Sequence, residues 1–157
     1  MIPLNDTDKT LWMLFRTNLG YFYESRSTDQ GKTWSPAVPT KIQASAAPGT
    51  LIRLSDNRIL LVYNPLRASD GVTPAIMNDK HHQAVPSSWQ RREIVLITSC
   101  NEGKTWSNPL VIGRIPGDTD SIGKWLSYAS LWEFDGYLYI VTGQGGLQTR
   151  IPINKLP

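Results

Sequence analysis

The sequence predicts an all-β fold of mostly antiparallel strands arranged as a repeated unit. Three observations favour it: short apolar segments, turn sequences between them, and one octet that occurs twice. The segments are rich in aromatic and β-branched residues and are bounded by Gly, Pro, Asn or Asp, as expected of strands. They cover 11–17, 21–27, 49–54, 59–64, 93–99, 109–113, 128–134 and 137–143. No stretch with the period and length of a helix competes with them.

Two turn sequences predict how neighbouring strands pair. LSDNRILL at 54–61 and EFDGYLYI at 133–140 each place a two-residue turn containing Asp between apolar segments. Such turns join adjacent antiparallel strands, because Asp, Asn and Gly tolerate the left-handed backbone of a tight hairpin. We therefore expect hairpin to follow hairpin along the chain.

The octet STDQGKTW at 27–34 returns as SCNEGKTW at 99–106. Each copy follows a predicted strand and precedes another short apolar strand, in SPAVPTKI and SNPLVIG. The repeating unit is thus strand, strand, octet turn, strand. This pattern predicts a propeller or a solenoid, because one such unit cannot bury its face without neighbours.

The two octets lie 72 positions apart, which exceeds the roughly 40 to 50 residues of one four-stranded blade. The segment 66–90, which is long and contains Pro, Ser and Asp, accounts for the excess. We predict that it is an insertion loop reaching over one end of the propeller axis. The rest of the chain supplies parts of about three blades, fewer than a closed propeller needs.

The residue types of the octet predict a turn that holds itself together. The Asp accepts backbone hydrogen bonds, the Gly supplies a positive φ, the Ser and Thr hydroxyls add local bonds, and the Trp fills the gap between strands or blades. These residues are Ser27, Asp29, Gly31, Thr33 and Trp34 in the first copy and Ser99, Asn101, Gly103, Thr105 and Trp106 in the second. Asn101 keeps the acceptor and loses the charge, which a catalytic carboxylate would not tolerate. The octet is therefore predicted to be structural.

This octet resembles the Asp-box, or bacterial neuraminidase (BNR) repeat, of sialidase-like propellers. The resemblance extends over nearly the whole chain and implies one domain, 1–157, that is similar to the C-terminal half of a six-bladed sialidase catalytic domain. Asp-boxes also occur in non-enzymatic propellers such as sorting receptors. The octet by itself does not choose between an enzyme and a binding protein.

The resemblance also implies site residues. In sialidases a strand ending in an arginine leads into a hairpin and an Asp-box, and the matching segment 11–34 makes Arg16 the second member of the family's arginine triad. An Asn-Pro then precedes an arginine eight residues before the next box, which selects Arg91, with Arg92 as the alternative one residue on. A tyrosine in an A-Y-S-like segment follows one strand after that box. Tyr128 matches it and would be the nucleophile.

The chemistry of these residue types fits a sialic acid, which carries a carboxylate on its anomeric carbon. Guanidinium groups bind a carboxylate with two hydrogen bonds and stay charged at any working pH. A tyrosine nucleophile avoids the repulsion that an Asp or Glu would meet there, and sialidases are exceptions to the two-carboxylate rule for glycosidases. The expected activity is retaining hydrolysis of terminal sialic acid from glycoconjugates, with no cofactor and no metal.

The family's first arginine, its acid/base aspartate and the glutamate that activates its tyrosine all belong to the part before Met1. The resemblance therefore implies that this chain alone is inactive and begins partway through its domain. Open blade edges and an unfinished core predict poor stability or self-association unless the missing N-terminal half is supplied.

Other residues are weaker candidates. Arg114 and Arg150 lie in sequences like the Arg-Ile-Pro that opens sialidase domains, but both come after the boxes and are expected in loops. Glu24 and Glu133 are candidates to hold an arginine or the tyrosine, while His81 and His82 are expected to be an exposed pair in the insertion. Trp89, Trp125 and Trp132 either line a sugar site or pack within blades.

Composition excludes several classes of protein. The net charge is +3, from 16 Lys and Arg against 13 Asp and Glu, and the basic residues are scattered, so nucleic acid is not predicted as a partner. The one cysteine, Cys100, excludes an intramolecular disulfide and a Cys-rich metal site. No segment is long enough to span a bilayer and the N-terminus lacks a signal-peptide pattern. We expect a soluble chain with no export signal, and the compartment stays open, although the family is usually secreted or periplasmic.

Three functions stay open on the residues: a sialidase-type glycosidase, a non-catalytic propeller that binds glycan or protein, and a related glycosidase for another acidic or neutral sugar. An Arg-Ile-Pro strand, a loop Asp and a Glu upstream of Met1 would favour the first. Release of a fluorogenic sialoside is the simplest test.

Overall fold

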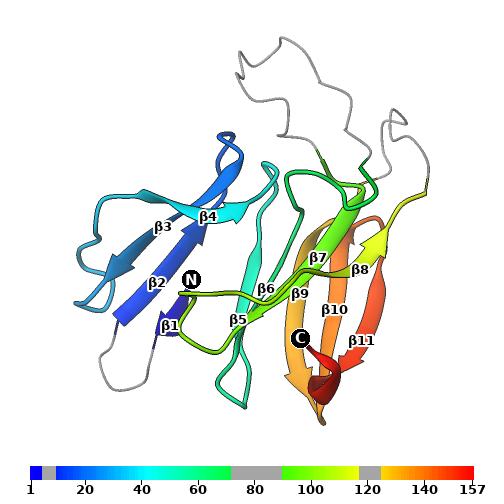
Figure 1. Cartoon of the computed structure of the whole chain (residues 1–157). Helices are drawn as coiled ribbons and strands as arrows, with labels where there is room; N and C mark the ends of the chain where they lie inside the picture. The colour runs from blue at the N-terminus through cyan, green and yellow to red at the C-terminus, as the bar shows by residue number, and fades with distance from the viewer. Residues whose placement is uncertain (5–9, 72–89, 117–124) are drawn as a thin grey trace.

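The protein consists of three antiparallel sheets that lie side by side (Figure 1). The computed structural model describes residues 1–4, 10–71, 90–116 and 125–157. The first sheet contains β1 (Ile2–Leu4), β2 (Thr10–Phe15), β3 (Tyr21–Ser27) and β4 (Val38–Gln43) in that order. The second contains β5 (Thr50–Arg53), β6 (Ile59–Tyr63), β7 (Glu93–Ser99) and β8 (Leu110–Arg114). The third contains β9 (Ser127–Phe134), β10 (Tyr137–Gln144) and β11 (Gln148–Pro152), and a short 3₁₀ helix, η1 (Ile153–Lys155), follows it.

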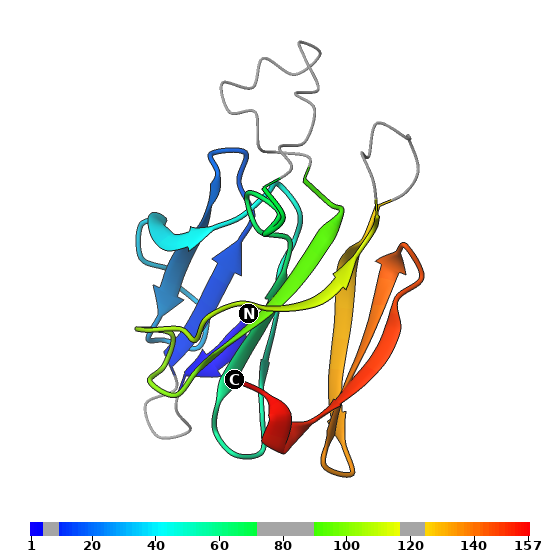
Figure 2. The same cartoon turned by 45° about the vertical axis from the view of Figure 1, so that its right-hand side comes forward.

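The sheets are arranged as propeller blades, and the first strand of each sheet lies next to the first strand of the following one. β5 contacts β1 on one side and β9 on the other, so the first strand of each sheet adjoins that of the next. Figure 2, turned by 45°, shows the same three sheets standing next to one another. This arrangement confirms the predicted all-β fold and is that of a partial β-propeller with two four-stranded blades and one three-stranded blade among the described residues.

Every predicted strand is present, but two strands were missed. β1 spans three residues and includes Pro3, and β11 reads QTRIP, so neither shows the alternation by which strands are found in a sequence. Arg150 therefore lies in a strand, and Arg114 is the last residue of β8; the prediction that both are loop residues was wrong.

The two predicted hairpin turns differ in length. Asp135 and Gly136 form the expected two-residue turn, with φ of 48° and 74° and with Phe134 paired to Tyr137. In the other hairpin the loop is one residue longer than predicted, because Leu54 and Arg58 pair across it and the Asn57 N–H bonds to the Leu54 carbonyl. A left-handed Asn57, at φ 69°, closes this three-residue loop.

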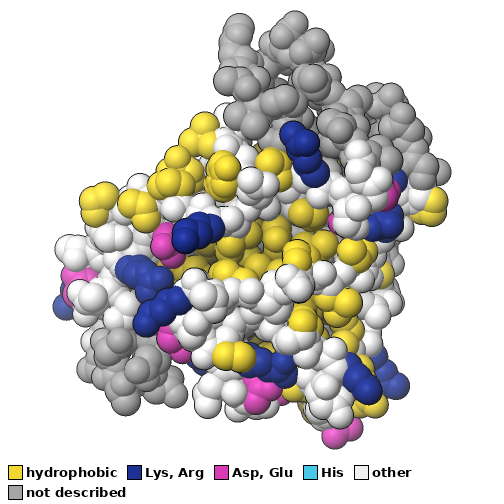
Figure 3. Space-filling view, in the orientation of Figure 1, with side chains coloured by type: hydrophobic (Ala, Val, Ile, Leu, Met, Phe, Trp, Pro, Cys, Tyr) yellow, Lys and Arg dark blue, Asp and Glu magenta, His cyan; other side chains and the backbone are white. Residues whose placement is uncertain are grey.

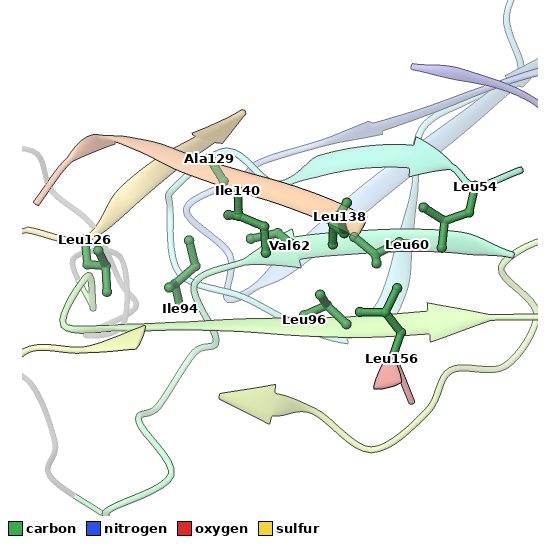
Figure 4. Close-up of a cluster of buried hydrophobic side chains, with 10 residues drawn as sticks. All are labelled: Leu54, Leu60, Val62, Ile94, Leu96, Leu126, Ala129, Leu138, Ile140 and Leu156. Atoms are coloured by element: carbon green, nitrogen blue, oxygen red, sulfur yellow. The ribbon is translucent and has the colours of Figure 1, made fainter. Parts of the chain in front are cut away.

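The second blade is the centre of the hydrophobic core, because both of its faces are covered. Every residue of β6 and β7 is buried, which explains why these strands read as continuous apolar runs. One cluster joins the second and third blades (Figure 4): Leu54, Leu60, Val62, Ile94, Leu96, Leu126, Ala129, Leu138, Ile140 and Leu156. Another joins the first and second blades: Phe22, Ile42, Ala44, Leu61, Tyr63, Val95 and Ile97. Alternate residues of β6 thus pack against opposite neighbours.

Both octets form the same hydrogen-bonded turn between the third and fourth strands of their blades. In the first, the Ser27 Oγ accepts from the Gly31 N–H at 2.8 Å, and Asp29 accepts from the Thr33 N–H at 2.8 Å and from the Thr33 hydroxyl at 2.6 Å. In the second, Ser99 accepts from Gly103, and the Asn101 Oδ1 accepts from the Thr105 N–H at 2.9 Å. The amide of Asn101 also donates to the Thr105 hydroxyl, so it replaces the carboxylate without loss of a bond.

Asp29 is expected to make the stability of the protein depend on pH in the acid range. The hydrogen bond from the Thr33 side chain is the largest of the effects that lower the pKa of Asp29 from 3.8 to about 2. A depressed folded-state pKa means that the stabilisation is fully present above the unfolded value, near pH 4, and is lost as pH falls through about 2. An NMR titration of the Asp29 carboxyl carbon checks this, and a midpoint near 3.8 would contradict it. Urea unfolding at pH 2 to 5 should depend less on pH in Asp29→Asn.

Trp106 of the second octet fills the gap between the first and second blades. Its ring centroid lies 6.2 Å from that of Trp12, which is 1% exposed, and it packs against both clusters that involve the first blade. A Cβ on Gly103 would lie 2.8 Å from the Trp12 ring, so the octet approaches the neighbouring blade closely. Trp34, at the same position of the first octet, packs against none of the three hydrophobic clusters formed by the described residues.

The tryptophans of the two octets are therefore expected to differ in their effect on stability. Trp106→Ala should lower the free energy of unfolding by about 3 kcal/mol, because it leaves a cavity between two blades. Trp34→Ala should lower it by about 1 kcal/mol or less, since that side chain fills no gap between described blades. Urea denaturation of both variants measures the difference. Equal losses would contradict the assignment of Trp106 to the blade interface.

Candidate functional site

Arg16, Arg91 and Tyr128 come from three different blades but lie at the same end of the sheets. Arg16 directly follows β2, Arg91 lies two residues before β7, and Tyr128 is the second residue of β9. Because neighbouring strands are antiparallel, the end of β2 and the starts of β7 and β9 fall on one side, the upper side in Figure 1. Both octets lie at the opposite end of their blades. The fold therefore separates the octets from the predicted site residues.

The structure brings the three side chains together around the Tyr128 phenol. The Nη1 of Arg16 donates to the Tyr128 Oη at 3.5 Å, and the guanidinium carbon of Arg91 lies 5.3 Å from the centroid of the Tyr128 ring. Arg91 is 6% exposed, whereas Tyr128 is 40% exposed. The partly exposed phenol of Tyr128 thus lies between two guanidinium groups. That of Arg91 is held in place by burial.

The backbone of Tyr128 adopts an uncommon conformation. Its φ is 60°, in the left-handed region that a non-glycine residue adopts at a cost of about 1 to 2 kcal/mol. The ladder between β9 and β10 pairs Ala129 with Thr142 and Ser127 with Gln144, while Tyr128 has no partner in that register. Local strain of this kind is concentrated at functional sites, where the surrounding structure holds it.

The electrostatics favour the ionised phenol. The hydrogen bond from Arg16, followed by the positive charge of Arg91, lowers the pKa of Tyr128 below its usual value of 10.0. Each arginine stabilises the phenolate more than the phenol, because an opposite charge or a hydrogen bond to the charged form favours that form. A lower pKa increases the fraction of Tyr128 that is nucleophilic at a given pH.

Two residues that the sequence prediction missed hold these groups in place. The Oε1 of Gln144 accepts from the Nη1 of Arg91 at 3.3 Å and from the hydroxyl of Ser127, the residue before Tyr128. The buried amide of Asn64 donates to the carbonyls of Glu93 and Leu126, at 2.7 and 2.8 Å. The sequence does contain a signal for Gln144. Strand pairing counted outward from the turn at Asp135–Gly136 places Gln144 opposite Ser127.

Residues 1–140 match the BNR repeat-like domain. The chain belongs to this family. The match places it in the superfamily of sialidases and BNR-repeat proteins, as the two octets predicted. No curated protein matches the chain.

In this BNR repeat-like domain Arg92 is directed away from Tyr128. It donates to both carboxylate oxygens of Asp70, at 2.9 and 2.8 Å, and is 3% exposed. Next to it Glu93, which is 1% exposed, accepts from Arg114 and from the backbone and hydroxyl of Ser69. Of the two adjacent arginines, only Arg91 lies against the tyrosine.

The weaker candidates of the BNR repeat-like domain have mostly structural contacts. Glu24 accepts from the Trp12 indole at 2.6 Å and from Arg26, and Glu133 accepts from Ser55, so neither contacts Tyr128. Trp132 stacks on Tyr139, away from the site, with ring centroids 5.5 Å apart.

Trp125 is the tryptophan that reaches the site, with its ring 5.3 Å from the guanidinium of Arg91. His81, His82, Trp89 and most of the predicted insertion at 66–90 lie outside the described residues.

The described residues contain neither a cluster of metal-ligating side chains nor a membrane-spanning helix. Over 1–4, 10–71, 90–116 and 125–157, no group of three or more His, Cys, Asp or Glu side chains is arranged to hold a metal ion. The same ranges contain no helix long and apolar enough to cross a membrane.

Proposed function

We propose that this protein is an exo-glycosidase of the sialidase type, which releases terminal sialic acid with retention of configuration. The observation that carries the proposal is the convergence of Arg16 and Arg91 on Tyr128. Arg16 and Arg91 would hold the substrate carboxylate, and Tyr128 would be the nucleophile. The lowered pKa of Tyr128 and its left-handed backbone support this role.

The reaction would proceed in two displacements. The Tyr128 oxygen forms a bond to the anomeric carbon as the bond to the aglycone breaks, and the proton that the phenol loses balances the one that the aglycone oxygen takes up. Water then attacks the same carbon, the bond to Tyr128 breaks, and the phenol is restored. Two inversions give net retention. The two guanidinium groups fix the carboxylate next to the reacting carbon, which orients that carbon toward Tyr128.

The test is the hydrolysis of a fluorogenic α-sialoside by the longest form of the protein that contains this chain, since the chain alone is expected to be inactive, with a fluorogenic β-galactoside as the neutral control. We expect release from the sialoside only, and NMR should detect the α-anomer of the free sugar as the first product. Preferential cleavage of the galactoside, or first appearance of the β-anomer, would contradict the proposal.

One observation favours a second candidate, a propeller that binds acidic glycans without cleaving them. Among the residues that the structure describes, no carboxylate contacts the Tyr128 hydroxyl, so the general base of the family's mechanism is not seen beside it. Saturation-transfer NMR with a methyl sialoside distinguishes the two functions. Binding without any turnover would favour this second candidate.

Gln144 is expected to act as a positioning residue for Arg91. Gln144→Ala removes the acceptor that orients the Nη1 of Arg91, so KM for the sialoside should rise about tenfold, whereas kcat should fall less than about threefold. Gln148→Ala, an exposed change in β11, is the control and should alter neither constant. A fall of about tenfold in kcat with KM unchanged would argue against a positioning role for Gln144.

A further inference from the structure

A groove separate from the Tyr128 site lies between the first and second blades. It has a volume of about 580 Å³, and its lining comes from β4, β6, β7, the second octet and the segment after Tyr63. Its apolar lining includes Ile42, Tyr63, Ile97 and Trp106. Figure 3 shows hydrophobic side chains at the hollowed centre of this face, with Lys and Arg side chains around them. Neither Arg16, Arg91 nor Tyr128 lines it.

The charges that line the groove are all positive. Lys41, Arg67 and Lys104 line it, whereas its described lining includes no Asp or Glu. None of these three cations forms an ion pair within the described ranges. Five arginines elsewhere do pair with carboxylates: Arg26, Arg53, Arg58, Arg92 and Arg114. Cations without protein partners around a concave surface attract an anion.

The groove continues into a second hollow of about 370 Å³ that shares Lys41, Ile42, Lys104 and Trp106 with it. One carboxylate, Glu24, lines this extension, and it is already hydrogen-bonded to Trp12 and paired with Arg26. The two hollows together form one site, and Lys41 and Lys104 line both of its parts. The two volumes have room for a ligand of several linked units, and the cations favour one with repeated negative charge.

The backbone of β4 disfavours an added peptide strand as that ligand. A peptide that extends a sheet needs free N–H and carbonyl groups on the edge strand. Pro39 has no N–H, and the N–H of Ile42 bonds to the Thr40 hydroxyl. A sugar does not need this ladder, because it binds through charge and through stacking on an aromatic ring such as that of Trp106.

We propose that this groove binds an acidic oligosaccharide at a site distinct from the place of cleavage. The choice of a glycan rests on the proposed function, whereas the groove and its charges do not. Lys41, Arg67 and Lys104 contact the carboxylates, and Trp106 contacts the sugar rings. A glycoconjugate with several acidic sugars is thereby held while one terminal residue occupies the Tyr128 site.

The experiment measures binding of an α2,8-linked N-acetylneuraminic acid trimer to the full chain, by calorimetry and by the NMR signal of the Trp106 indole N–H. Lys41→Gln/Lys104→Gln should weaken binding at this signal by about tenfold or more, because two charge-assisted contacts are lost. Lys32→Gln/Lys155→Gln, which changes two exposed lysines elsewhere, is the matched control and should retain the affinity. Maltotriose, which is neutral, should not bind.

Three results would overturn the proposal: no shift of the Trp106 signal, equal affinity in the Lys41/Lys104 variant, or tighter binding of a hexaglutamate peptide than of the trimer. Repeating the titration with Tyr128→Phe separates this proposal from the proposed function. Groove binding should persist in that variant whether or not the chain hydrolyses sialosides. Loss of hydrolysis alone therefore leaves the groove assignment standing.

Discussion

Tyr128→Phe is expected to lower kcat for release of a fluorogenic sialoside by at least about 10³-fold, because it removes the oxygen that we propose as the nucleophile. The aromatic ring remains, so the 5.3 Å contact with Arg91 and the packing of β9 are retained. Both arginines also remain, and the affinity for a methyl sialoside should change by less than about threefold. The predicted result is thus a loss of kcat with binding preserved.

Tyr137→Phe is the matched control for this change. Tyr137 lies at the far end of the same hairpin, next to the turn, where Arg150 covers its ring at 4.6 Å. It should keep full activity. Turnover by Tyr128→Phe equal to that of Tyr137→Phe would exclude Tyr128 as the nucleophile.

Arg91→Leu is expected to reduce kcat/KM for the sialoside by about 10²- to 10³-fold. A buried guanidinium that binds the substrate carboxylate is worth several kcal/mol, and its removal would leave Arg16 as the one guanidinium of the pair to hold that carboxylate. Steady-state kinetics with the sialoside measure the effect. An unchanged kcat/KM in Arg91→Leu would contradict the role of Arg91 as a carboxylate-binding residue.

Arg92→Leu makes the same substitution at the adjacent residue, and it should affect stability and not catalysis. It breaks the pair with Asp70, so the free energy of unfolding should fall by about 2 kcal/mol, while kcat/KM of the folded protein changes less than about threefold. This loss is smaller than for a fully buried pair because the Asp70 side chain is 25% exposed. A larger loss of kcat/KM in Arg92→Leu than in Arg91→Leu would show that Arg92, and not Arg91, is the site residue.

The strands could be predicted where the core imposes a pattern. β6 and β7 lie between two neighbouring blades and read as apolar runs, and β9 and β10 are joined by an Asp-Gly turn with one preferred geometry. β1 and β11 could not be found, because each is hydrogen-bonded to one neighbouring strand and neither shows the apolar alternation of a strand. Pairing with one neighbour, and not an apolar pattern of their own, makes them strands.

The site could be predicted only in part, for a related reason. The octets fix the position of each blade in the sequence, and this register singled out Arg16, Arg91 and Tyr128, which the structure places together. Gln144 and Asn64 were missed because their roles depend on contacts between hairpins that are distant in sequence. Arg91 and Arg92 directly precede β7, and the count from the octet does not tell which of two adjacent side chains faces Tyr128, so the sequence alone left both as alternatives.

The origin of Arg16, Arg91 and Tyr128 in three separate blades has a thermodynamic consequence. A ligand that contacts all three fastens the blades to one another, so it binds the docked arrangement and not a chain whose blades have come apart. By linkage, an anionic sugar at a hundred times its Kd should stabilise the folded chain by about 2.7 kcal/mol. Linkage also acts in the other direction. Loosening the interface between blades, as in Trp106→Ala, should weaken the affinity for a sugar bound at Arg16, Arg91 and Tyr128. Occupancy of the site is thus a direct measure of how firmly the blades are assembled.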